Sequence, residues 1–305
     1  MSSTEPNKYS IEFYPPRTAE GEAKLDIVHA QLAKLNPDFF SVTYGAGGST
    51  KKGTEQIVLR YRTAGSNVAP HLSFGGTDED EVRALLSRYR ETGVDRIVAL
   101  RGDLPSGVAA HHRFASELVA FIRKETGDHF HIDVACYPET HPDSKSYASD
   151  VDYFKTKVDA GANSALTQYF YNPDAYFRFV DYCRDRGIDI PIVPGIMPIT
   201  NFENLSRFSA TSGAEIPRWL RSQLECFSND KDGMREFGID VVTELCDDLL
   251  SGGAPGLHFY SMNLSRTVTR IWNNLSISNS KSWLKASAKK RSVSCESQEF
   301  TLIRS

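Results

Sequence analysis

The sequence has 305 residues, of which 40% are hydrophobic and 24% charged, which is enough apolar side chain for one large globular domain. A net charge of -4 gives no basic surface of the kind that nucleic acid selects, and no apolar run reaches the roughly 18 residues of a membrane span. The N-terminus lacks the apolar segment of a signal peptide, and no cysteines pair as C-x-x-C. We therefore expect a cytoplasmic protein with reduced thiols and neither a nucleic-acid nor a membrane partner.

Short runs rich in β-branched and aromatic residues alternate with longer helical patterns. Strands are predicted at Tyr9–Tyr14, Phe39–Tyr44, Val68–Phe74, Arg96–Arg101, Ile132–Tyr137, Ala165–Phe170, Ile190–Ile196 and Leu257–Met262. Helices are predicted at Glu20–Leu35, Lys52–Gly65, Asp78–Thr92, Ser116–Gly127, Ser146–Ala160, Pro173–Arg186, Phe202–Ser209, Pro217–Glu225, Lys231–Ser251 and Leu264–Leu275. Such strands have to pair in parallel, because a parallel connection needs a crossover.

Several helix boundaries carry their own signals. Asp78 can cap a helix, with Glu81 three residues on as in a capping box. A glycine, which adopts positive φ without a Cβ clash, follows four of the helical patterns, at Gly93, Gly127, Gly161 and Gly187. These signals support the alternation of helices and strands.

Eight strand–helix units favour an α/β fold of the TIM-type (β/α)₈ barrel class. The alternative is an open doubly wound sheet, but the G-x-G-x-x-G turn that usually follows its first strand is absent. We predict a short N-terminal segment over residues 1–8, a single barrel domain over 9–275 and a basic tail over 276–305. The tail has six basic residues against two acidic ones and no amphipathic period, so we expect it to be disordered.

The chemistry of a parallel barrel is carried by the C-terminal ends of its strands, and these ends are polar here. Glu12 alternates with Ile11 and Phe13, so it faces the barrel interior if those two apolar side chains face the helices. Burial there would raise the pKa of Glu12 and suit it to general acid catalysis near neutral pH. The alternative is a solvated charge at the end of the strand.

The other strand ends add glycines, histidines and an Arg-Gly-Asp turn. Arg101–Asp103 could hold a polar heterocycle or a phosphate from two sides, or form a local ion pair. His71 is as often structural as functional, and with His141 it lacks the spacing of a helix-borne zinc pair, so we expect no metal site. Together these groups suit a planar, partly charged organic ligand without naming it.

Nine segments carry a more specific signal in combination than any one of them carries alone. They are Ile11–Arg17 (IEFYPPR), Ser41–Ala46 (SVTYGA), Ala69–Leu72 (APHL), Ala99–Pro105 (ALRGDLP), Tyr137–Pro142 (YPETHP), Lys157–Ala162 (KVDAGA), Thr167–Phe170 (TQYF), Pro194–Pro198 (PGIMP) and His258–Tyr260 (HFY). In this order, over about residues 9–275, the sequence resembles the methylenetetrahydrofolate reductase family. The resemblance implies bound FAD, NADH or NADPH as reductant, and ping-pong reduction of 5,10-methylenetetrahydrofolate to 5-methyltetrahydrofolate, a step of one-carbon metabolism that supplies methionine synthesis.

The resemblance also implies roles for individual residues. Glu12 would be the proton donor that opens the folate ring, and Asp103 would hydrogen-bond the pterin and favour the cationic intermediate. Residues similar to FAD contacts are Tyr44, His71, Arg101, Gly102, Asp103, Ala115, Tyr137, His141, Asp150 and Lys157. Residues similar to folate or nicotinamide contacts are Thr43, Asp103, Gln168, Asn204, Phe208 and Tyr260. We also expect a homo-oligomer.

The sequence departs from the family pattern at a few positions. Asn204 stands where some relatives carry glutamine, and Leu264 where some carry arginine, although Arg266 is close. At the adenine side, Tyr153 and Thr156 replace more polar residues. These departures lie at positions that the resemblance places near the folate tail and the adenine.

Two other interpretations remain open from the sequence. One is a different FAD barrel, such as a proline dehydrogenase-like enzyme, against which the Glu12 and Arg101–Asp103 segments argue. The other is a barrel scaffold that has lost catalysis, because the presence of a motif does not prove turnover.

Overall fold

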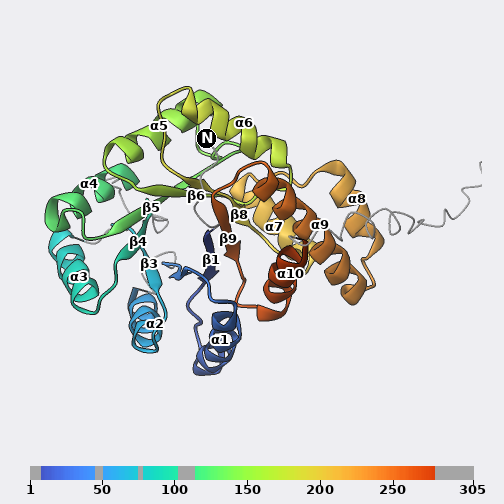
Figure 1. Cartoon of the computed structure of the whole chain (residues 1–305), viewed down its shortest axis with the longest axis horizontal. Helices are drawn as coiled ribbons and strands as arrows, with labels where there is room; N and C mark the ends of the chain where they lie inside the picture. Colours follow the sequence, from blue (N-terminus) through green and yellow to red (C-terminus); the bar gives the residue numbers. More distant parts are fainter. Residues whose placement is uncertain (1–7, 45–50, 75–77, 102–113, 279–305) are drawn as a thin grey trace, which may run out of the picture.

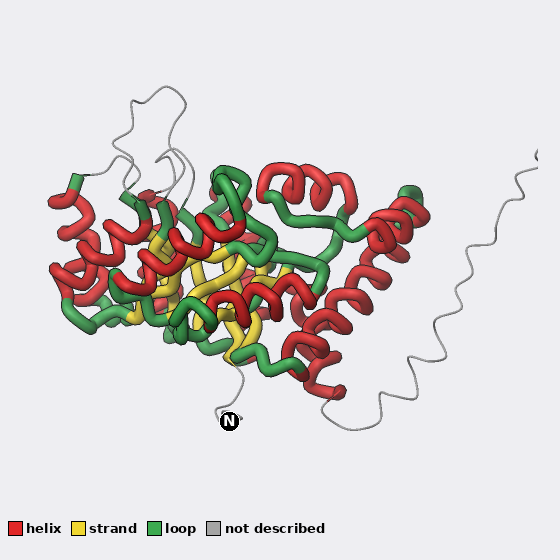
Figure 2. Tube along the Cα trace, turned by 90° about the horizontal axis from the view of Figure 1, so that it is seen from above, coloured by secondary structure: helices red, strands yellow, loops and turns green. Residues whose placement is uncertain are grey.

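Parallel strands form a nearly closed ring that is surrounded by helices, as Figure 1 shows. The computed structural model describes residues 8–44, 51–74, 78–101 and 114–278. The helices follow one another around the ring in chain order (Figure 1), and seen from above the strands lie between them (Figure 2). The predicted TIM-type (β/α)₈ barrel is confirmed, while nearly all of the predicted N-terminal segment and basic tail lies outside the described residues.

The sheet follows the chain around the ring. Its strands are β1 (Lys8–Phe13), β2 (Phe39–Val42), β3 (Val68–Leu72), β4 (Arg96–Ala99), β5 (His131–Cys136), β6 (Ser164–Thr167), β7 (Ile192–Val193), β8 (Gly195–Ile196) and β9 (Gly256–Tyr260). They are hydrogen-bonded in the order β7-β6-β5-β4-β3-β2-β1-β9-β8, and every pair is parallel.

The seventh predicted strand, Ile190–Ile196, is split into two short strands, which corrects the prediction of a continuous one. β7 pairs with β6 and β8 pairs with β9, so the ring closes through the chain at Pro194. Proline has no N–H to give to a ladder, which interrupts the strand. Thr167 bridges the gap, because its Oγ1 accepts a hydrogen bond of 2.9 Å from the Gly195 N–H. A side chain therefore completes the closure that a backbone ladder would otherwise make.

The helices agree with the predicted ones to within a few residues at their ends. They are α1 (Ala19–Leu32), α2 (Lys51–Thr63), α3 (Glu79–Glu91), α4 (Ala115–Thr126), α5 (Tyr147–Asp159), α6 (Pro173–Arg184), α7 (Phe202–Ser212), α8 (Arg218–Cys226), α9 (Lys231–Ser251) and α10 (Ser265–Ser278). A 3-10 turn, η1 (Ala33–Leu35), follows α1. In the described part of the chain, none of these helices is long and apolar enough to cross a membrane.

The predicted boundary signals are confirmed. Asp78 caps α3 by accepting a hydrogen bond of 2.9 Å from the Glu81 N–H. The four glycines that follow helices have positive φ, between 58° and 111°, at Gly93, Gly127, Gly161 and Gly187. Each helix thus stops where the next strand has to begin.

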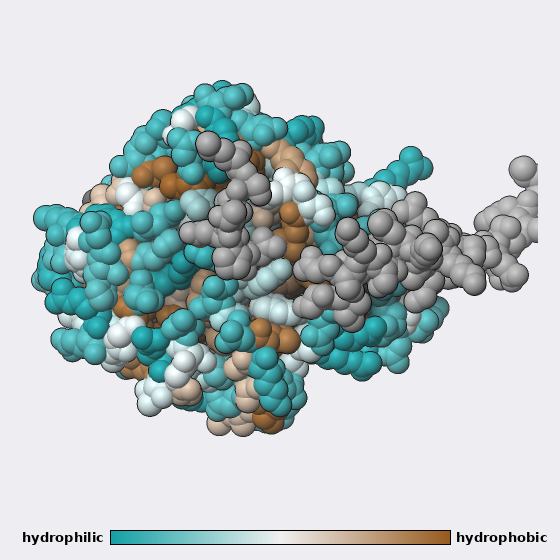
Figure 3. Space-filling model, viewed as in Figure 1, coloured by the Kyte–Doolittle hydropathy of each residue, from teal (hydrophilic) through white to brown (hydrophobic). Residues whose placement is uncertain are grey.

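The two faces of the ring differ in composition. Ile11 and Phe13 are fully buried in the large apolar core between strands and helices, so the alternate residue Glu12 faces inward, as predicted. A smaller apolar cluster fills the inside of the ring: Phe39, Ala69, Val98 and Leu166. On the outside, the helices present mostly hydrophilic side chains (Figure 3). The inner cluster forms a floor, and the polar groups lie above it at the C-terminal ends of the strands.

Several strands end earlier than predicted. β3 ends at Leu72 and β4 at Ala99, so Ser73 and the residues from Leu100 onward leave the ladder. Ser73, Leu100 and Arg101 then line a cavity at the top of the barrel. The prediction extended the strands into positions that serve the site instead.

Candidate active site

Glu12 meets two histidines at the mouth of the barrel. One carboxylate oxygen, Oε2, lies 3.2 Å from Nε2 of His71 on β3 and 3.5 Å from Nε2 of His258 on β9. The Glu12 side chain is 17% exposed, whereas the His258 side chain is completely buried. The three strands thus bring a carboxylate and two imidazoles together beside the opening of the ring.

The two imidazoles reverse the expected pKa of Glu12. Burial acts to raise it, as predicted, but the charge of His71 and hydrogen bonding to both histidines outweigh burial and lower the pKa to about 2. The prediction of a raised pKa was therefore wrong, because the sequence did not show that two histidines would converge on this carboxylate. Glu12 is therefore ionised near neutral pH.

The backbone of Glu12 is held by residues at the end of β9. The Ser261 hydroxyl donates a hydrogen bond of 2.5 Å to the Glu12 carbonyl oxygen. On β9, Tyr260 is the register partner of Glu12, and its hydroxyl donates a hydrogen bond of 2.6 Å to the Thr167 carbonyl. Burial raises the pKa of Tyr260, so its phenol stays protonated. These hydrogen bonds tie the backbone at Glu12 and the side chain of Tyr260 to their neighbours in the ring.

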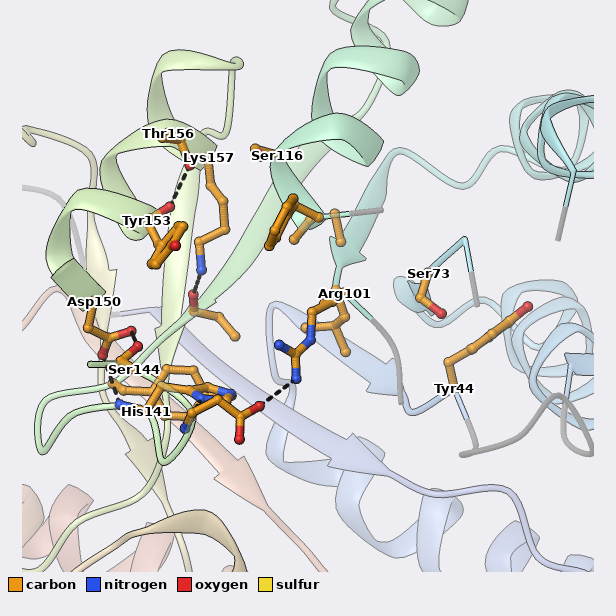
Figure 4. Close-up of a pocket in the computed structure, with 17 residues that line it drawn as sticks. Tyr44, Ser73, Arg101, Ser116, His141, Ser144, Asp150, Tyr153, Thr156 and Lys157 are labelled. Atoms are coloured by element: carbon orange, nitrogen blue, oxygen red, sulfur yellow. Dashed lines mark hydrogen bonds and ion pairs between the residues drawn. The ribbon is translucent and has the colours of Figure 1, made fainter. Parts of the chain in front are cut away.

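A cavity of about 410 Å³ opens beside this cluster, within the range of small-molecule sites. The segments that follow strands β2 to β5, the start of α4 and one side of α5 surround it. Its lining includes Tyr44, Ser73, Arg101, Phe114, Ala115, Ser116, Tyr137, His141, Asp143, Ser144, Asp150, Tyr153, Thr156 and Lys157. In Figure 4, His141, Ser144 and Asp150 lie together on one side, and Tyr44 and Ser73 lie on the opposite side. A helix N-terminus is electropositive, so this wall suits an anionic ligand.

The protonation of His141 follows from its hydrogen bonds. The Asp143 N–H donates to His141 Nδ1 at 3.0 Å, so in the neutral ring the proton is on Nε2. Burial lowers the pKa of His141, which favours that neutral form. Asp150 accepts hydrogen bonds of 2.9 Å from the His141 N–H and from the Ser144 hydroxyl, which fixes the loop. His141 can then donate one hydrogen bond from Nε2.

Two cations reach this cavity. Arg101 Nη2 lies 2.9 Å from Asp143 Oδ2 in a half-exposed ion pair. Lys157 Nζ donates a hydrogen bond of 2.5 Å to the Ala135 carbonyl, and its contact with that strand is visible in Figure 4. Burial lowers the pKa of Lys157, and an anion placed beside it would raise that pKa again.

An exposed aromatic pair marks the rim of the cavity. The rings of Phe114 and Tyr153 are stacked, with centroids 6.2 Å apart and planes 16° from parallel. Both side chains are about half exposed, at 47% and 55%. Large aromatic groups left in contact with water at the edge of a cavity can receive a planar ring.

The structure brings most of the expected cofactor residues together. Seven of them line the cavity: Tyr44, Arg101, Ala115, Tyr137, His141, Asp150 and Lys157. His71 contacts Glu12 instead of lining the cavity, and Gly102 and Asp103 lie outside the described residues.

The expected substrate residues are more spread out. Thr43 and Gln168 directly follow β2 and β6 and are partly buried. Asn204 and Phe208 lie on α7, where Asn204 accepts a hydrogen bond from Arg207 and Phe208 is 36% exposed. None of these residues lines the cavity described above, so their roles remain predictions.

Sequence reasoning missed some residues of the site. Asp143 and Ser144 were not singled out, although they directly follow the Tyr137–Pro142 segment that was. His258 was noted only as part of a motif, and alternation would have pointed its side chain inward with Ser10 and Glu12. Among the described residues, no group of three or more His, Cys, Asp or Glu side chains is arranged to hold a metal ion.

Comparison with known proteins decides the family. Residues 2–276 match the family described as methylenetetrahydrofolate reductase. The chain belongs to this family. Two bacterial members named 5,10-methylenetetrahydrofolate reductase are similar over nearly their whole length. The Buchnera aphidicola protein is 40% identical over 86% of this chain and 89% of its own, and the Escherichia coli K12 protein is 38% identical over 88% and 90%.

A plant member of the methylenetetrahydrofolate reductase family is longer. Methylenetetrahydrofolate reductase (NADH) 1 of Arabidopsis thaliana is 36% identical over 88% of this chain, which covers 48% of the plant protein. Among solved structures, an uncharacterized protein from Clostridium thermocellum that binds two copies of 5-methyl-5,6,7,8-tetrahydrofolic acid aligns with a TM-score of 0.64 at 18% identity. That alignment covers 90% of this chain and 96% of the other, and it supports the same fold.

Proposed function

We propose that this protein is a methylenetetrahydrofolate reductase that binds FAD, takes hydride from NADH or NADPH, and reduces 5,10-methylenetetrahydrofolate to 5-methyltetrahydrofolate. Family membership over nearly the whole chain supports the reaction. The observation that carries the site assignment is the cavity whose lining includes seven of the residues expected to hold the cofactor.

The residues of the cavity fit a dinucleotide. Its two phosphates need cationic and N–H donors, which Arg101, Lys157, the His141 Nε2–H and the start of α4 at Ala115 offer. The aromatic rim suits one of its planar rings. We assign the cofactor to this cavity on these grounds.

When bound, the flavin would accept hydride from the nicotinamide and give it to the folate, so that both substrates use one site in turn. Lys157 and Arg101 would neutralise the phosphates, and His141 would orient the cofactor through its Nε2–H. The cavity wall between β3 and β5 would exclude water from the reacting groups.

Glu12 would supply the proton that opens the folate ring. Its carboxylate contacts two buried imidazoles near the C-terminal ends of the strands. Because the imidazoles hold its pKa near 2, the protonated form is a strong acid, and Glu12 has to receive its proton once the folate is in place. Asp103 would assist by favouring the cation, as the family resemblance implies.

The experiment combines cofactor identification with the two half-reactions. We expect the purified protein to be yellow and to release FAD on heating. Anaerobic stopped-flow absorbance should show bleaching by NADH or NADPH, and recovery of the oxidised spectrum with 5,10-methylenetetrahydrofolate. A protein without flavin would instead support the scaffold interpretation. A flavin bleached by proline but not reoxidised by the folate would support the proline dehydrogenase-like alternative. The cytoplasmic location and the homo-oligomeric state remain predictions.

A further inference from the structure

A buried serine–histidine pair lies directly behind Glu12. Ser10 Oγ and His258 Nδ1 are 2.7 Å apart, and both side chains are on the inner face of the ring, since Ser10 and His258 are register partners. His258 is completely buried and Ser10 is 3% exposed. The other ring nitrogen of His258, Nε2, faces Glu12 Oε2 at 3.5 Å. The three side chains therefore form a line from the inside of the barrel to its mouth.

The hydroxyl of Ser10 suits either protonation state of His258. A serine hydroxyl can donate to an unprotonated Nδ1 or accept from a protonated one. Within the described part of the chain, His258 Nε2 has no hydrogen-bond partner of good geometry beyond the long 3.5 Å contact with Glu12 Oε2. A buried ring nitrogen without a partner is costly, and the nearby carboxylate of Glu12 is the group that can relieve that cost. The ionisation of Glu12 therefore depends on the contact between its carboxylate and the His258 ring.

The other strands add few groups that could replace this coupling. His71 on β3 contacts Glu12. The residues that lie against His258 are Tyr260 on β9, Phe39 on β2 and Gly195 on β8. The Tyr260 hydroxyl donates to the Thr167 carbonyl, so its proton is directed away from the carboxylate. Only His71 shares the role of stabilising ionised Glu12 among these groups.

We infer that His258, held through Nδ1 by Ser10, is a positioning residue that controls the protonation of Glu12 in the folate half-reaction. This inference rests on the proposed function. An N–H directed at the carboxylate stabilises its ionised form, so the protonated form gives up its proton more readily. Loss of His258 should make Glu12 a weaker acid that stays protonated to higher pH.

The pH dependence of the folate half-reaction tests this. In the wild type, reoxidation should slow as the pH rises and Glu12 loses its proton. His258→Phe should move this falling limb at least one pH unit higher, and Ser10→Ala should move it in the same direction by less. His258→Gln keeps a donor and should restore most of the wild-type position. Reduction by NADH should show no matching shift of its pH dependence in these variants, because that step takes no proton from Glu12.

A matched control separates this effect from a loss of packing. His29 is also a buried histidine bonded to a serine, with Nε2 2.9 Å from Ser66 Oγ, but it lies between α1 and the ring. His29→Gln should leave the pH limb unchanged even if it lowers the thermal midpoint. A shift in this control equal to that of His258→Phe would overturn the inference.

An infrared measurement gives a readout that needs neither cofactor nor turnover. Difference spectra against Glu12→Gln isolate the carboxyl band of Glu12. As the pH is lowered, we expect the protonated band to appear at a higher pH in His258→Phe than in the wild type. Unchanged spectra and an unchanged limb in both His258→Phe and Ser10→Ala would overturn the inference, and Ser10→Ala decides alone if the first variant does not fold. Failure of the wild type to bind flavin or react with folate would refute the proposed function. The infrared comparison would still test whether His258 controls the protonation of Glu12.

Discussion

Replacing Glu12 by glutamine should separate the two half-reactions. Glutamine keeps the size of the side chain and one acceptor oxygen, and position 12 does not line the flavin cavity, so the variant should fold and bind FAD. Reduction by the nicotinamide needs no proton from this group. Ring opening of the folate does need an acid, which an amide cannot supply.

The structure sets the size of the two effects. Glu12, which contacts His71 and His258, is the proposed acid, and general acid catalysis is worth about 10²–10⁴-fold, or roughly 3–5 kcal/mol, in the folate step. Removing one negative charge beside two imidazoles also alters the electrostatics of the nicotinamide step. We expect that change to stay within about tenfold, or about 1.4 kcal/mol.

The same substitution should change how stability depends on pH. The folded pKa of Glu12 is lowered from 4.5 to about 2, so its ionised form stabilises the fold above pH 4.5, and this contribution is lost as the pH falls toward 2. The thermal midpoint of the wild type should therefore drop more steeply than that of Glu12→Gln between pH 4.5 and 2. Parallel curves would mean that the imidazoles do not stabilise the carboxylate.

Stopped-flow absorbance of flavin bleaching and of reoxidation measures both half-reactions directly. Equal slowing of the two would show that Glu12 shapes the flavin site instead of donating a proton. A folate step at the wild-type rate would show that the proton comes from elsewhere, and the assignment of Glu12 would then fail.

Three further substitutions test the cavity and the barrel. Lys157→Met should weaken FAD binding at least tenfold, about 1.4 kcal/mol, by calorimetry. In the FAD-free wild type, the free energy of unfolding should rise as the pH rises from the lowered pKa of Lys157 to 10.5, because in that range the unfolded lysine binds a proton that the folded one does not. Lys157→Met should abolish this rise. Tyr153→Ala should weaken binding of FAD more than of FMN if the aromatic rim holds the adenine, and equal losses would contradict this. Gly195→Ala places a Cβ 2.2 Å from the Thr167 carbonyl oxygen and should cost about 1–3 kcal/mol in denaturant unfolding. In the matched control Gly53→Ala, inside α2, the added Cβ would lie 3.5 Å from its nearest neighbour, Pro15 Cβ. This substitution should leave the free energy of unfolding unchanged or raise it.

The sequence predicted the barrel well because its signals are local. Period-2 strands, helical periods, the Asp78 cap and the glycines after helices each depend on a few neighbouring residues. The break in the seventh strand was missed, although Pro194 lies inside the predicted segment, because the strand pattern continues on both sides of it. Closure there depends on Thr167, which is 28 residues away.

The sequence predicted many of the residues of the site, but not the pKa of Glu12 or the ion pair of Arg101. The inward direction of Glu12 follows from alternation with Ile11 and Phe13. The pKa of Glu12 depends on side chains from β3 and β9, which are brought together only when the ring closes. The pairing of Arg101 with Asp143 is likewise a contact between strand ends that spacing does not encode.

The split at Pro194 leaves the barrel weakly paired at this point of the ring. The ladders that join β7 to β6 and β8 to β9 have two register pairs each, as does that between β3 and β4, whereas the ladders of β1 and β5 have four or five. Fewer backbone hydrogen bonds have to break there, so the amide protons of Ile192–Ile196 should exchange with solvent faster than those of β1 and β5. Gly195 and the Thr167 side chain that bonds it lie on this line, beside Tyr260. Local opening of the barrel at β7 and β8 would then occur beside the proposed active site, where small motions alter the space available to a substrate.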